Sequence, residues 1–251
     1  MCTVIFIPDN KKIFLASLRD ESPKRLQAVA PDVTMVNGVK VLSPKDTLAG
    51  GTWIGTNSLA NVIILLNGGF DNHTRNNYYR KSRGLIVTEL LATEFPVFEW
   101  SKTDMTDIEP FTLIAWSKGD LFQLVWDGSK KNSIHLDATV PHIWSSATLY
   151  NLPVSLHRKN LFQHWIAEKP AISKLTILDF FNSFIDAQNG FIMNRNEKIK
   201  TLSYTFLEIN NQTSSMSYID FLSGNSIERS ISFTSMEEDH TSENKVEVIS
   251  A

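Results

Sequence analysis

Short runs of β-branched and aromatic residues, paired around tight polar turns, constrain the fold of this chain more than any other feature. Such pairs lie at residues 2–18, 51–66 and 111–127. Two apolar runs that flank a turn of Pro, Asp, Asn or Gly are typical of a β-hairpin. Strands joined by hairpins run antiparallel, so we expect antiparallel sheets rather than a parallel, doubly wound sheet.

Helices are predicted at three places between these strands. Ser82 is a candidate N-cap for a helix that carries Leu85, Ile86, Leu90 and Leu91 on one face. Apolar residues at helical spacing predict two further helices at 156–166 and 175–185. Further strands are expected at 142–150, 201–209, 215–222 and 226–234.

The order of these elements predicts an α+β fold in which helices cover two antiparallel sheets. Residues 22–47 contain three prolines, and we expect them to be mostly loop. We expect one domain over residues 1–235, because 251 residues suffice for one large core. Residues 236–251 read as a polar tail, in which 245–249 could add an edge strand.

Composition excludes several classes of function. The 24 basic and 27 acidic residues give a net charge of −3, so nothing favours binding to nucleic acid or to an anionic membrane surface. No apolar run approaches the roughly 20 residues of a membrane-spanning helix. The start of the chain lacks a basic region, and its apolar run stops at Pro8, so it does not resemble a signal peptide.

The single cysteine excludes a disulfide within the chain. A lone thiol that must stay reduced suits a reducing compartment, and we expect a cytoplasmic protein. We expect no metal, since His157 and His164 have no third ligand at suitable spacing. We expect no cofactor either, because Gly50 and Gly51 lack the spacing of a phosphate-binding loop. A homo-oligomer is possible.

The cysteine is residue 2, which gives it a possible chemical role. If Met1 is removed, Cys2 carries both a thiol and a free α-amine. An α-amine with a pKa of about 7.7–8.0 is partly unprotonated near neutral pH and can accept the thiol proton. A nucleophile and its base would then sit on one residue. The alternative is an incidental cysteine that packs as a small apolar side chain.

Charged residues at the end of the first hairpin favour the chemical role. A turn at 8–11 brings residues 17–21 beside residues 1–4. Asp20 would then hold the α-amine, and Arg19 would favour the thiolate of Cys2 or bind a substrate carboxylate. A charged loop after a strand is the other interpretation.

Five motifs in order resemble the NRDE family, also called the transport and Golgi organisation 2 family. They are MCTVIF at 1–6, FLASLRDE at 14–21, AGGTWIG at 49–55, LNG at 66–68 and SRG at 82–84. The resemblance is dense over residues 2–91 and thin beyond them.

That family is similar to N-terminal nucleophile (Ntn) hydrolases such as penicillin V acylase and bile salt hydrolase. The resemblance implies a four-layer αββα sandwich, with Cys2 as nucleophile and Arg19 and Asp20 around it. It also implies Asn67 as an oxyanion-hole residue, where an amide N–H meets the charge of a tetrahedral intermediate. A turn is the alternative for residues 67–69. The remaining candidate substrate contacts are Trp53, Gly68, Tyr78 and Ser146.

Two positions depart from the family pattern. Leu18 stands where the namesake motif has Asn, and Ser146 stands where related hydrolases have a second oxyanion-hole Asn. The sequence therefore supports two hypotheses. One is a cysteine amidohydrolase or acyltransferase acting on a small non-peptide C–N bond. The other is a non-catalytic protein that binds a small lipid-like or haem-like molecule on the same scaffold.

Overall fold

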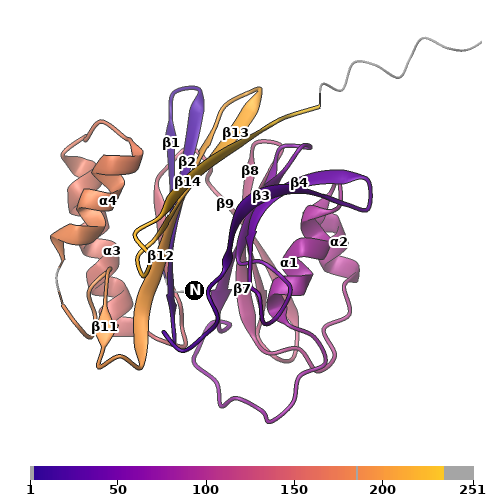
Figure 1. The fold of residues 1–251 in the computed structure, drawn as a ribbon, viewed down its shortest axis with the longest axis horizontal. Coiled ribbons are helices and arrows are strands. Elements are labelled where there is room, and N and C mark those ends of the chain that lie inside the picture. Colours follow the sequence, from indigo (N-terminus) through magenta and orange to yellow (C-terminus); the bar gives the residue numbers. More distant parts are fainter. Residues whose placement is uncertain (1–2, 185, 235–251) are drawn as a thin grey trace, which may run out of the picture.

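Two β-sheets lie face to face, and each is covered on its outer side by helices (Figure 1). The computed structural model of the chain describes residues 3–184 and 186–234. The four layers run helices, sheet, sheet, helices, so the α+β expectation with two antiparallel sheets is confirmed. The tail predicted at 236–251, with its possible edge strand, lies outside the described residues.

The first sheet contains the N-terminal hairpin and the C-terminal strands. Its strand order is β10-β1-β2-β12-β13-β14, and β11 pairs with β12. The bounds are β1 Thr3–Asp9, β2 Lys12–Glu21, β10 His142–Ser145, β11 Asn194–Arg195, β12 Ile199–Ile209, β13 Thr213–Asp220 and β14 Ser226–Ser232. All its pairings are antiparallel, and Thr3 lies opposite Leu18. Arg19 is therefore on the strand next to β1, as the hairpin pattern predicted.

The second sheet is a meander in chain order, β3 to β9. Its strands are β3 Val29–Val36, β4 Val39–Lys45, β5 Ile54–Asn57, β6 Asn61–Asn67, β7 Phe111–Ser117, β8 Asp120–Trp126 and β9 Lys131–Leu136. The predicted hairpins at 51–66 and 111–127 correspond to β5–β6 and β7–β8.

The helices cover the outer faces in pairs. α1 Arg83–Leu91 and α2 Pro96–Lys102 lie on the second sheet, and α3 Leu152–Ala167 and α4 Lys174–Ser183 lie on the first (Figure 1). Local sequence explains how two of them begin. Asn151 accepts a hydrogen bond from the backbone of Val154 at the start of α3, and Ser173 forms a capping box with Thr176 at the start of α4.

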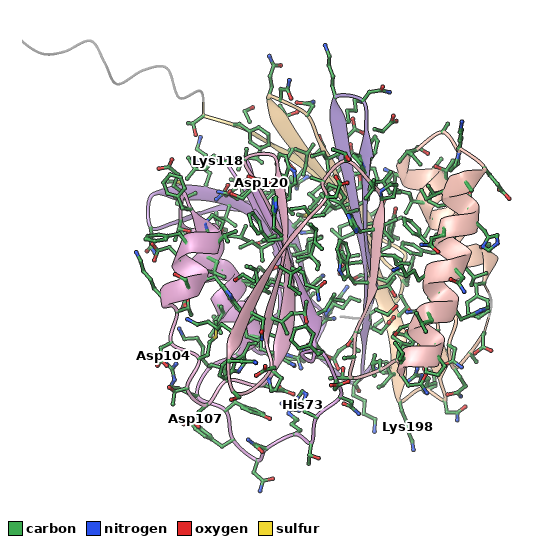
Figure 2. The ribbon with its side chains drawn as sticks, turned by 180° about the vertical axis from the view of Figure 1, so that it is seen from behind. His73, Asp104, Asp107, Lys118, Asp120 and Lys198 are labelled. Atoms are coloured by element: carbon green, nitrogen blue, oxygen red, sulfur yellow. The ribbon has the colours of Figure 1, made fainter. Side chains whose placement is uncertain are left out.

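Apolar side chains fill the space between the layers (Figure 2). One cluster joins the two sheets and continues to α1 and α2, where Ile86, Leu90 and Trp100 are buried. A second cluster joins the first sheet to α3 and α4, and includes Phe162 and Phe181. No helix within the described residues is long and apolar enough to cross a membrane.

The expectation that residues 22–47 are mostly loop was wrong, because β3 and β4 form a hairpin there. Proline is tolerated in a strand at a sheet edge or a bulge. β3 is an edge strand, and its register shifts between Val29 and Asp32, on either side of Pro31. The turn of this hairpin is Asn37-Gly38, with φ of 49° and 82°, which is a strong hairpin signal in the sequence.

Four other elements differ from the prediction. The strand expected at 142–150 ends at Ser145, because Leu149 and Tyr150 donate backbone hydrogen bonds to Ser146 in a turn. Helix α2 and strands β9 and β11 were not predicted. β9 is an edge strand of mostly polar sequence, so it lacks the apolar alternation that marks a half-buried strand.

Candidate active site

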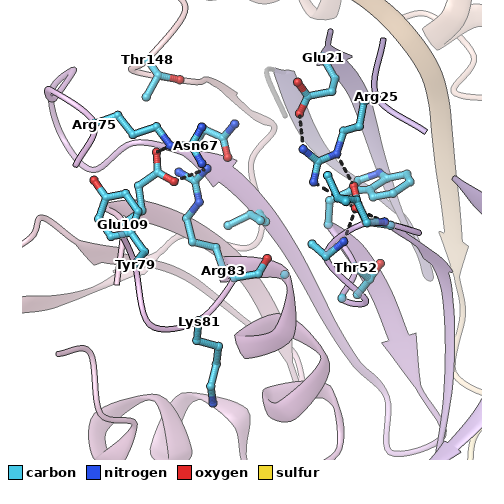
Figure 3. Close-up of a pocket in the computed structure, with 18 of the residues that line it drawn as sticks. Glu21, Arg25, Thr52, Asn67, Arg75, Tyr79, Lys81, Arg83, Glu109 and Thr148 are labelled. Atoms are coloured by element: carbon cyan, nitrogen blue, oxygen red, sulfur yellow. Dashed lines mark hydrogen bonds and ion pairs between the residues drawn. The ribbon is translucent and has the colours of Figure 1, made fainter. Parts of the chain in front are cut away.

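A cavity of about 950 Å³ opens at one end of the sandwich, between the two sheets. Its lining comes from the end of β2, the turn before β5, the end of β6 and the segment that leads into α1. Two charged clusters lie on opposite walls of this cavity (Figure 3). Three of the predicted site residues, Arg19, Trp53 and Asn67, are among the residues that line it.

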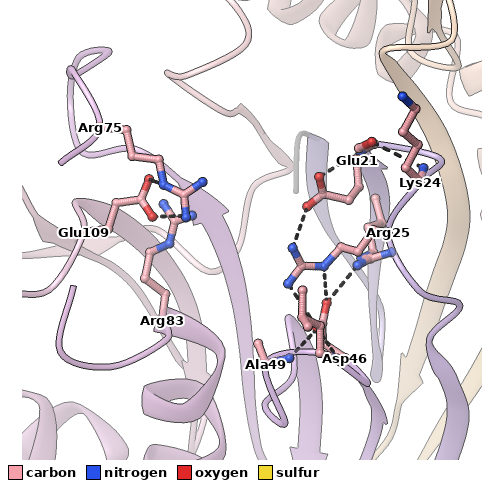
Figure 4. A network of polar contacts seen from close by, with 11 residues as sticks. Glu21, Lys24, Arg25, Asp46, Ala49, Arg75, Arg83 and Glu109 are labelled. Carbon is pink, nitrogen blue, oxygen red and sulfur yellow. Dashed lines mark hydrogen bonds and ion pairs between the residues drawn. The ribbon is translucent and has the colours of Figure 1, made fainter. Parts of the chain in front are cut away.

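Asp46 is the centre of the first charged cluster (Figure 4). Its carboxylate accepts hydrogen bonds from Arg19 Nη2 at 3.0 Å and from Arg25 Nε at 2.8 Å and Nη2 at 3.1 Å. The backbone N–H groups of Leu48 and Ala49 donate to it as well. Burial pushes the pKa of Asp46 upward, but these hydrogen bonds and the two guanidinium charges outweigh burial and hold the pKa below its usual range.

Arg19 is held from two sides. Its side chain is 7% exposed and pairs with Asp46, while its guanidinium lies 4.5 Å from the centre of the Trp53 ring. The ring of Trp53 is buried, and its indole N–H has no hydrogen-bond partner among the described residues. A stacked and ion-paired guanidinium has little freedom to move, so Arg19 presents a fixed positive charge to this end of the cavity.

Glu109 is the centre of the second charged cluster (Figure 4). Arg83 Nη2 lies 3.1 Å from one carboxylate oxygen, and Arg75 Nε and His73 Nε2 lie 3.7 Å and 3.4 Å from the other. Burial lowers the pKa of Arg83. Glu109 opposes this shift, and the charge of Arg75 adds to it. One carboxylate therefore lies within 4 Å of two guanidinium groups and an imidazole.

Two glycines explain why motifs 33 positions apart meet at the cavity. A Cβ on Gly51 would lie 2.2 Å from the backbone carbon of Gly84, so only glycine allows this approach. The backbone N–H of Thr52 donates to the carbonyl of Gly84 at 3.1 Å. This contact fixes the start of α1 against the turn before β5. Ser82 occupies the N-cap position as predicted, but its side chain makes no capping hydrogen bond.

Asp20 is buried beneath the cavity in a polar cluster. Thr201 Oγ1 donates to one of its carboxylate oxygens at 2.5 Å, and the hydroxyl of Tyr150 donates to the other at 3.2 Å. The Tyr150 ring lies 3.8 Å below the guanidinium of Arg158 on α3. Arg158 is fully buried and donates to Thr3 Oγ1 at 2.9 Å. Tyr150 and Arg158 thus connect Asp20 to Thr3, the first described residue of β1.

Asn67 and Ser146 connect the two sheets at the cavity. The Ser146 hydroxyl donates to the backbone carbonyl of Asn67 at 2.8 Å and contacts Thr148 Oγ1 at 3.0 Å. The amide side chain of Asn67 lines the cavity and has no hydrogen-bond partner among the described residues. Gly68 has φ of 88°, and its N–H donates to the carbonyl of Pro110, so it serves as a turn residue.

The structure brings together some of the other predicted site residues and separates others. Of the described residues, those lining the cavity include Tyr79 but not Tyr78, which is 70% exposed. Gly68 and Ser146 also lie outside that lining. Cys2, the predicted nucleophile, lies outside the described residues. No group of three potential metal ligands occurs in the described part of the chain.

Sequence reasoning missed three residues that organise the site: Asp46, Glu109 and Arg158. Asp46 follows a strand and precedes a glycine turn, which is a weak signal for a functional carboxylate. Glu109 and Arg158 have no local signal, because the residues they contact lie far away in the sequence.

Comparison with known proteins agrees with this architecture. The sequence profile of the family described as TANGO2, Transport and Golgi organisation 2, matches residues 1–233. No curated protein matches the sequence.

Solved structures of Ntn hydrolases share the fold. The Caenorhabditis elegans orthologue of N-acylethanolamine-hydrolyzing acid amidase is 12% identical with a TM-score of 0.58, covering 82% of this chain and 92% of its own. A mutant of conjugated bile acid hydrolase from Clostridium perfringens is 10% identical with a TM-score of 0.52, covering 93% and 97%. Another variant of that hydrolase is 10% identical with a TM-score of 0.51, covering 96% of this chain and 100% of its own.

Proposed function

We propose, from the premise that this chain belongs to the Transport and Golgi organisation 2 family, that it is an Ntn-type cysteine amidohydrolase or acyltransferase. Its substrate contains a small non-peptide C–N bond, and its nucleophile is Cys2 after removal of Met1. The reaction takes place in the cytoplasm, where a lone thiol stays reduced.

The observation that carries this proposal is the pairing of Thr3 with Leu18 in the β1–β2 hairpin. Cys2 is bonded to Thr3, and Arg19 follows Leu18 and lines the cavity. Cys2 is one peptide unit from Thr3, the described start of β1, and consecutive Cα atoms are about 3.8 Å apart. The proposal therefore requires the thiol to reach the cavity from a position one residue before Thr3.

The chemistry assigns one role to each group. The α-amine of Cys2 accepts the thiol proton as Sγ forms a bond to the substrate carbonyl carbon. The Asn67 amide donates to the resulting oxyanion, which explains why its donors have no partner among the described residues. When the C–N bond breaks, the ammonium returns the proton to the leaving nitrogen. Water, or an acceptor amine or alcohol, then cleaves the thioester.

Arg19 and Asp20 support this reaction without forming bonds to the substrate. The fixed guanidinium of Arg19 favours the thiolate over the thiol. Asp20, positioned by Thr201 and Tyr150, orients the α-amine. Trp53 and Leu65 offer apolar surface to the acyl chain.

A second candidate function is favoured by one specific observation. The Ser146 hydroxyl, at the position of a second oxyanion-hole amide in related hydrolases, donates to a backbone carbonyl and is buried. An oxyanion hole with one side-chain donor fewer loses roughly 10²–10³ in turnover. The alternative is therefore a protein that binds a small lipid-like or haem-like molecule in this cavity without turnover.

The test is the Cys2→Ser variant, assayed on N-acyl amino acids, acyl amines and β-lactams. We expect the variant to bind these compounds as tightly as the unaltered protein and to lose most turnover, because a hydroxyl ionises far less readily than a thiol. Protein that keeps Met1, produced with methionine aminopeptidase inhibited, should be equally impaired. An activity that Cys2→Ser retains in full would contradict the nucleophile assignment, and binding without turnover would support the alternative.

A further inference from the structure

The cavity is positively charged, although the chain as a whole is not. Among the described residues that line it are five basic side chains and three carboxylates, an excess of two positive charges. The whole chain carries a net charge of −3. A low-dielectric pocket concentrates the field of its charges, so this excess favours an anionic ligand.

The excess is not on the wall that contains Arg19. Asp46 pairs with both Arg19 and Arg25, and Glu21 lies 3.8 Å from Arg25. Two cations there face two carboxylates. Arg19 is moreover nearly inaccessible and stacked on Trp53. The sequence-based suggestion that Arg19 binds a substrate carboxylate is therefore hard to reconcile with its surroundings.

The excess is on the wall that contains Glu109. That single carboxylate lies between Arg75 and Arg83, with His73 on the same oxygen as Arg75. Arg75 is 77% exposed and lies 3.7 Å from Glu109, too far for a strong hydrogen bond. Its guanidinium therefore has unused donors. Lys81, which also lines the cavity, is paired with Glu89 outside the lining, so one of the two excess charges is compensated and the other remains at the Glu109 wall.

The start of α1 adds a second source of positive potential to this wall. Ser82, Arg83 and Gly84 line the cavity, and the Ser82 side chain makes no capping hydrogen bond, although its carbonyl accepts one from the N–H of Leu85. Unsatisfied N–H groups at a helix N-terminus attract oxyanions. The Nδ1 atom of His73 is also buried without a partner among the described residues.

We propose that Arg75, Arg83 and the start of α1 form a subsite for an oxyanion carried by the ligand, namely a carboxylate, sulfonate or phosphate group. The substrate of the proposed reaction is then an acyl compound with an anionic end held at the Glu109 wall. The identification of this ligand as a substrate rests on the proposed function. The binding of the anion does not, because it needs no chemical step.

The experiment measures binding to the Cys2→Ser protein by isothermal titration calorimetry at low salt. The probes are N-octanoylglycine, octanesulfonate and octyl phosphate, with N-octanoylglycine methyl ester and octanol as neutral partners. Hydrogen bonds to a charged group are stronger than those between neutral groups, so at least one anion should bind roughly tenfold more tightly than its neutral partner. Which of the three anions shows the preference identifies the oxyanion.

Matched variants locate the preference. Arg75→Gln and Arg83→Gln should each reduce it severalfold. Arg80→Gln should preserve it, because Arg80 pairs with Asp104 outside the cavity. Arg83 also donates to the carbonyl of Pro110, so its loss could disturb folding. Arg75 is exposed, so Arg75→Gln should fold normally and tests the subsite even if Arg83→Gln does not fold.

The outcomes separate this inference from the proposed function. A preference for an anion in the Cys2→Ser protein, together with no hydrolysis of any test compound by the unaltered protein, would leave the subsite standing and contradict the hydrolase. Hydrolysis of neutral and anionic compounds with equal efficiency would support the hydrolase and contradict the subsite. Failure of all three anions to bind at millimolar concentration, or a preference that Arg75→Gln leaves intact, would overturn the subsite.

Discussion

Arg158 Nη1 donates a hydrogen bond to Thr3 Oγ1 at 2.9 Å, which ties helix α3 to the first described residue of β1. The same guanidinium donates to Ser145 Oγ and to the carbonyl of Gly190, and it stacks on Tyr150. Tyr150 in turn donates to Asp20. A fully buried guanidinium is costly unless its donors are satisfied; here Nη1 and Nη2 donate, while Nε has no partner among the described residues. Its place between Thr3 and Asp20 gives it a role in holding the proposed nucleophile and its carboxylate in register.

Replacing this guanidinium should destabilise the fold. Arg158→Met keeps most of the side-chain length but removes the donor to two buried acceptors and to the half-buried Ser145 Oγ, so we expect a loss of about 2–4 kcal/mol in the free energy of unfolding. Urea denaturation at pH 7 measures it. Lys159→Met, on the exposed side of the same helix, is the control and should change stability by less than about 0.5 kcal/mol. Equal losses of stability in the two variants would contradict the claim that the hydrogen bonds of Arg158 stabilise the fold.

Asp46→Asn should lower stability in a pH-dependent way. The folded pKa of Asp46 lies below its usual range, so its contribution is fully present above the unfolded pKa of about 3.9 and is lost as the pH falls through the folded value. We expect a deficit of roughly 3 kcal/mol at pH 7, because Arg19 and Arg25 lose a shared partner.

Denaturation curves between pH 2 and pH 7 check this expectation. The gap between the variant and the unaltered protein should close below pH 4. Asp120→Asn, which removes an exposed carboxylate paired with His135, should show no such gap. A deficit that is constant with pH would show that the charge of Asp46 is not what stabilises the loop.

Gly51→Ala tests the close contact between the turn before β5 and α1. The added Cβ would overlap the backbone of Gly84, and we expect a loss of about 2–3 kcal/mol as the two segments separate. Gly119→Ala is the comparison, because its Cβ meets open space and its φ of 96° costs only about 1 kcal/mol of backbone strain. Thermal unfolding of the two variants distinguishes overlap from strain, and equal losses would contradict the contact.

Arg19→Leu should slow the alkylation of Cys2. A neighbouring cation favours the thiolate, which is the reactive form, so its removal raises the thiol pKa and reduces the rate with iodoacetamide several-fold near pH 7. Cys2 is the only cysteine, so the rate reports on it alone. The rates of variant and unaltered protein should converge above pH 10. Unchanged kinetics at pH 7 in a folded variant would place Arg19 away from the thiol.

The fold was predictable from the sequence where local patterns decide it. The N-terminal hairpin and the pairs β5–β6 and β7–β8 combine apolar strands with polar turns, and the structure confirms them. The β3–β4 hairpin was missed because its prolines were given more weight than the Asn37-Gly38 turn. An edge strand tolerates proline, and nothing local reveals which strand lies at an edge.

The site was predictable only in part. Arg19 and Asn67 line the cavity because they lie near the ends of strands in facing sheets, and the family resemblance implied both as site residues. No local pattern pairs Arg19 with Asp46, or Glu109 with Arg83, because such contacts depend on how the loops pack in three dimensions. No local pattern in the sequence marks Arg158, and only the structure shows that it is buried.

The most direct test of the central claim is the intact mass of the protein, quenched in acid during turnover of an N-acyl substrate. We expect the mass of a chain without Met1 and with one added acyl group, which fragmentation should locate on Cys2, because the thioester forms before water attacks. Hydrolysis of the substrate by a chain that retains Met1, or with the acyl group on any other residue, would contradict it.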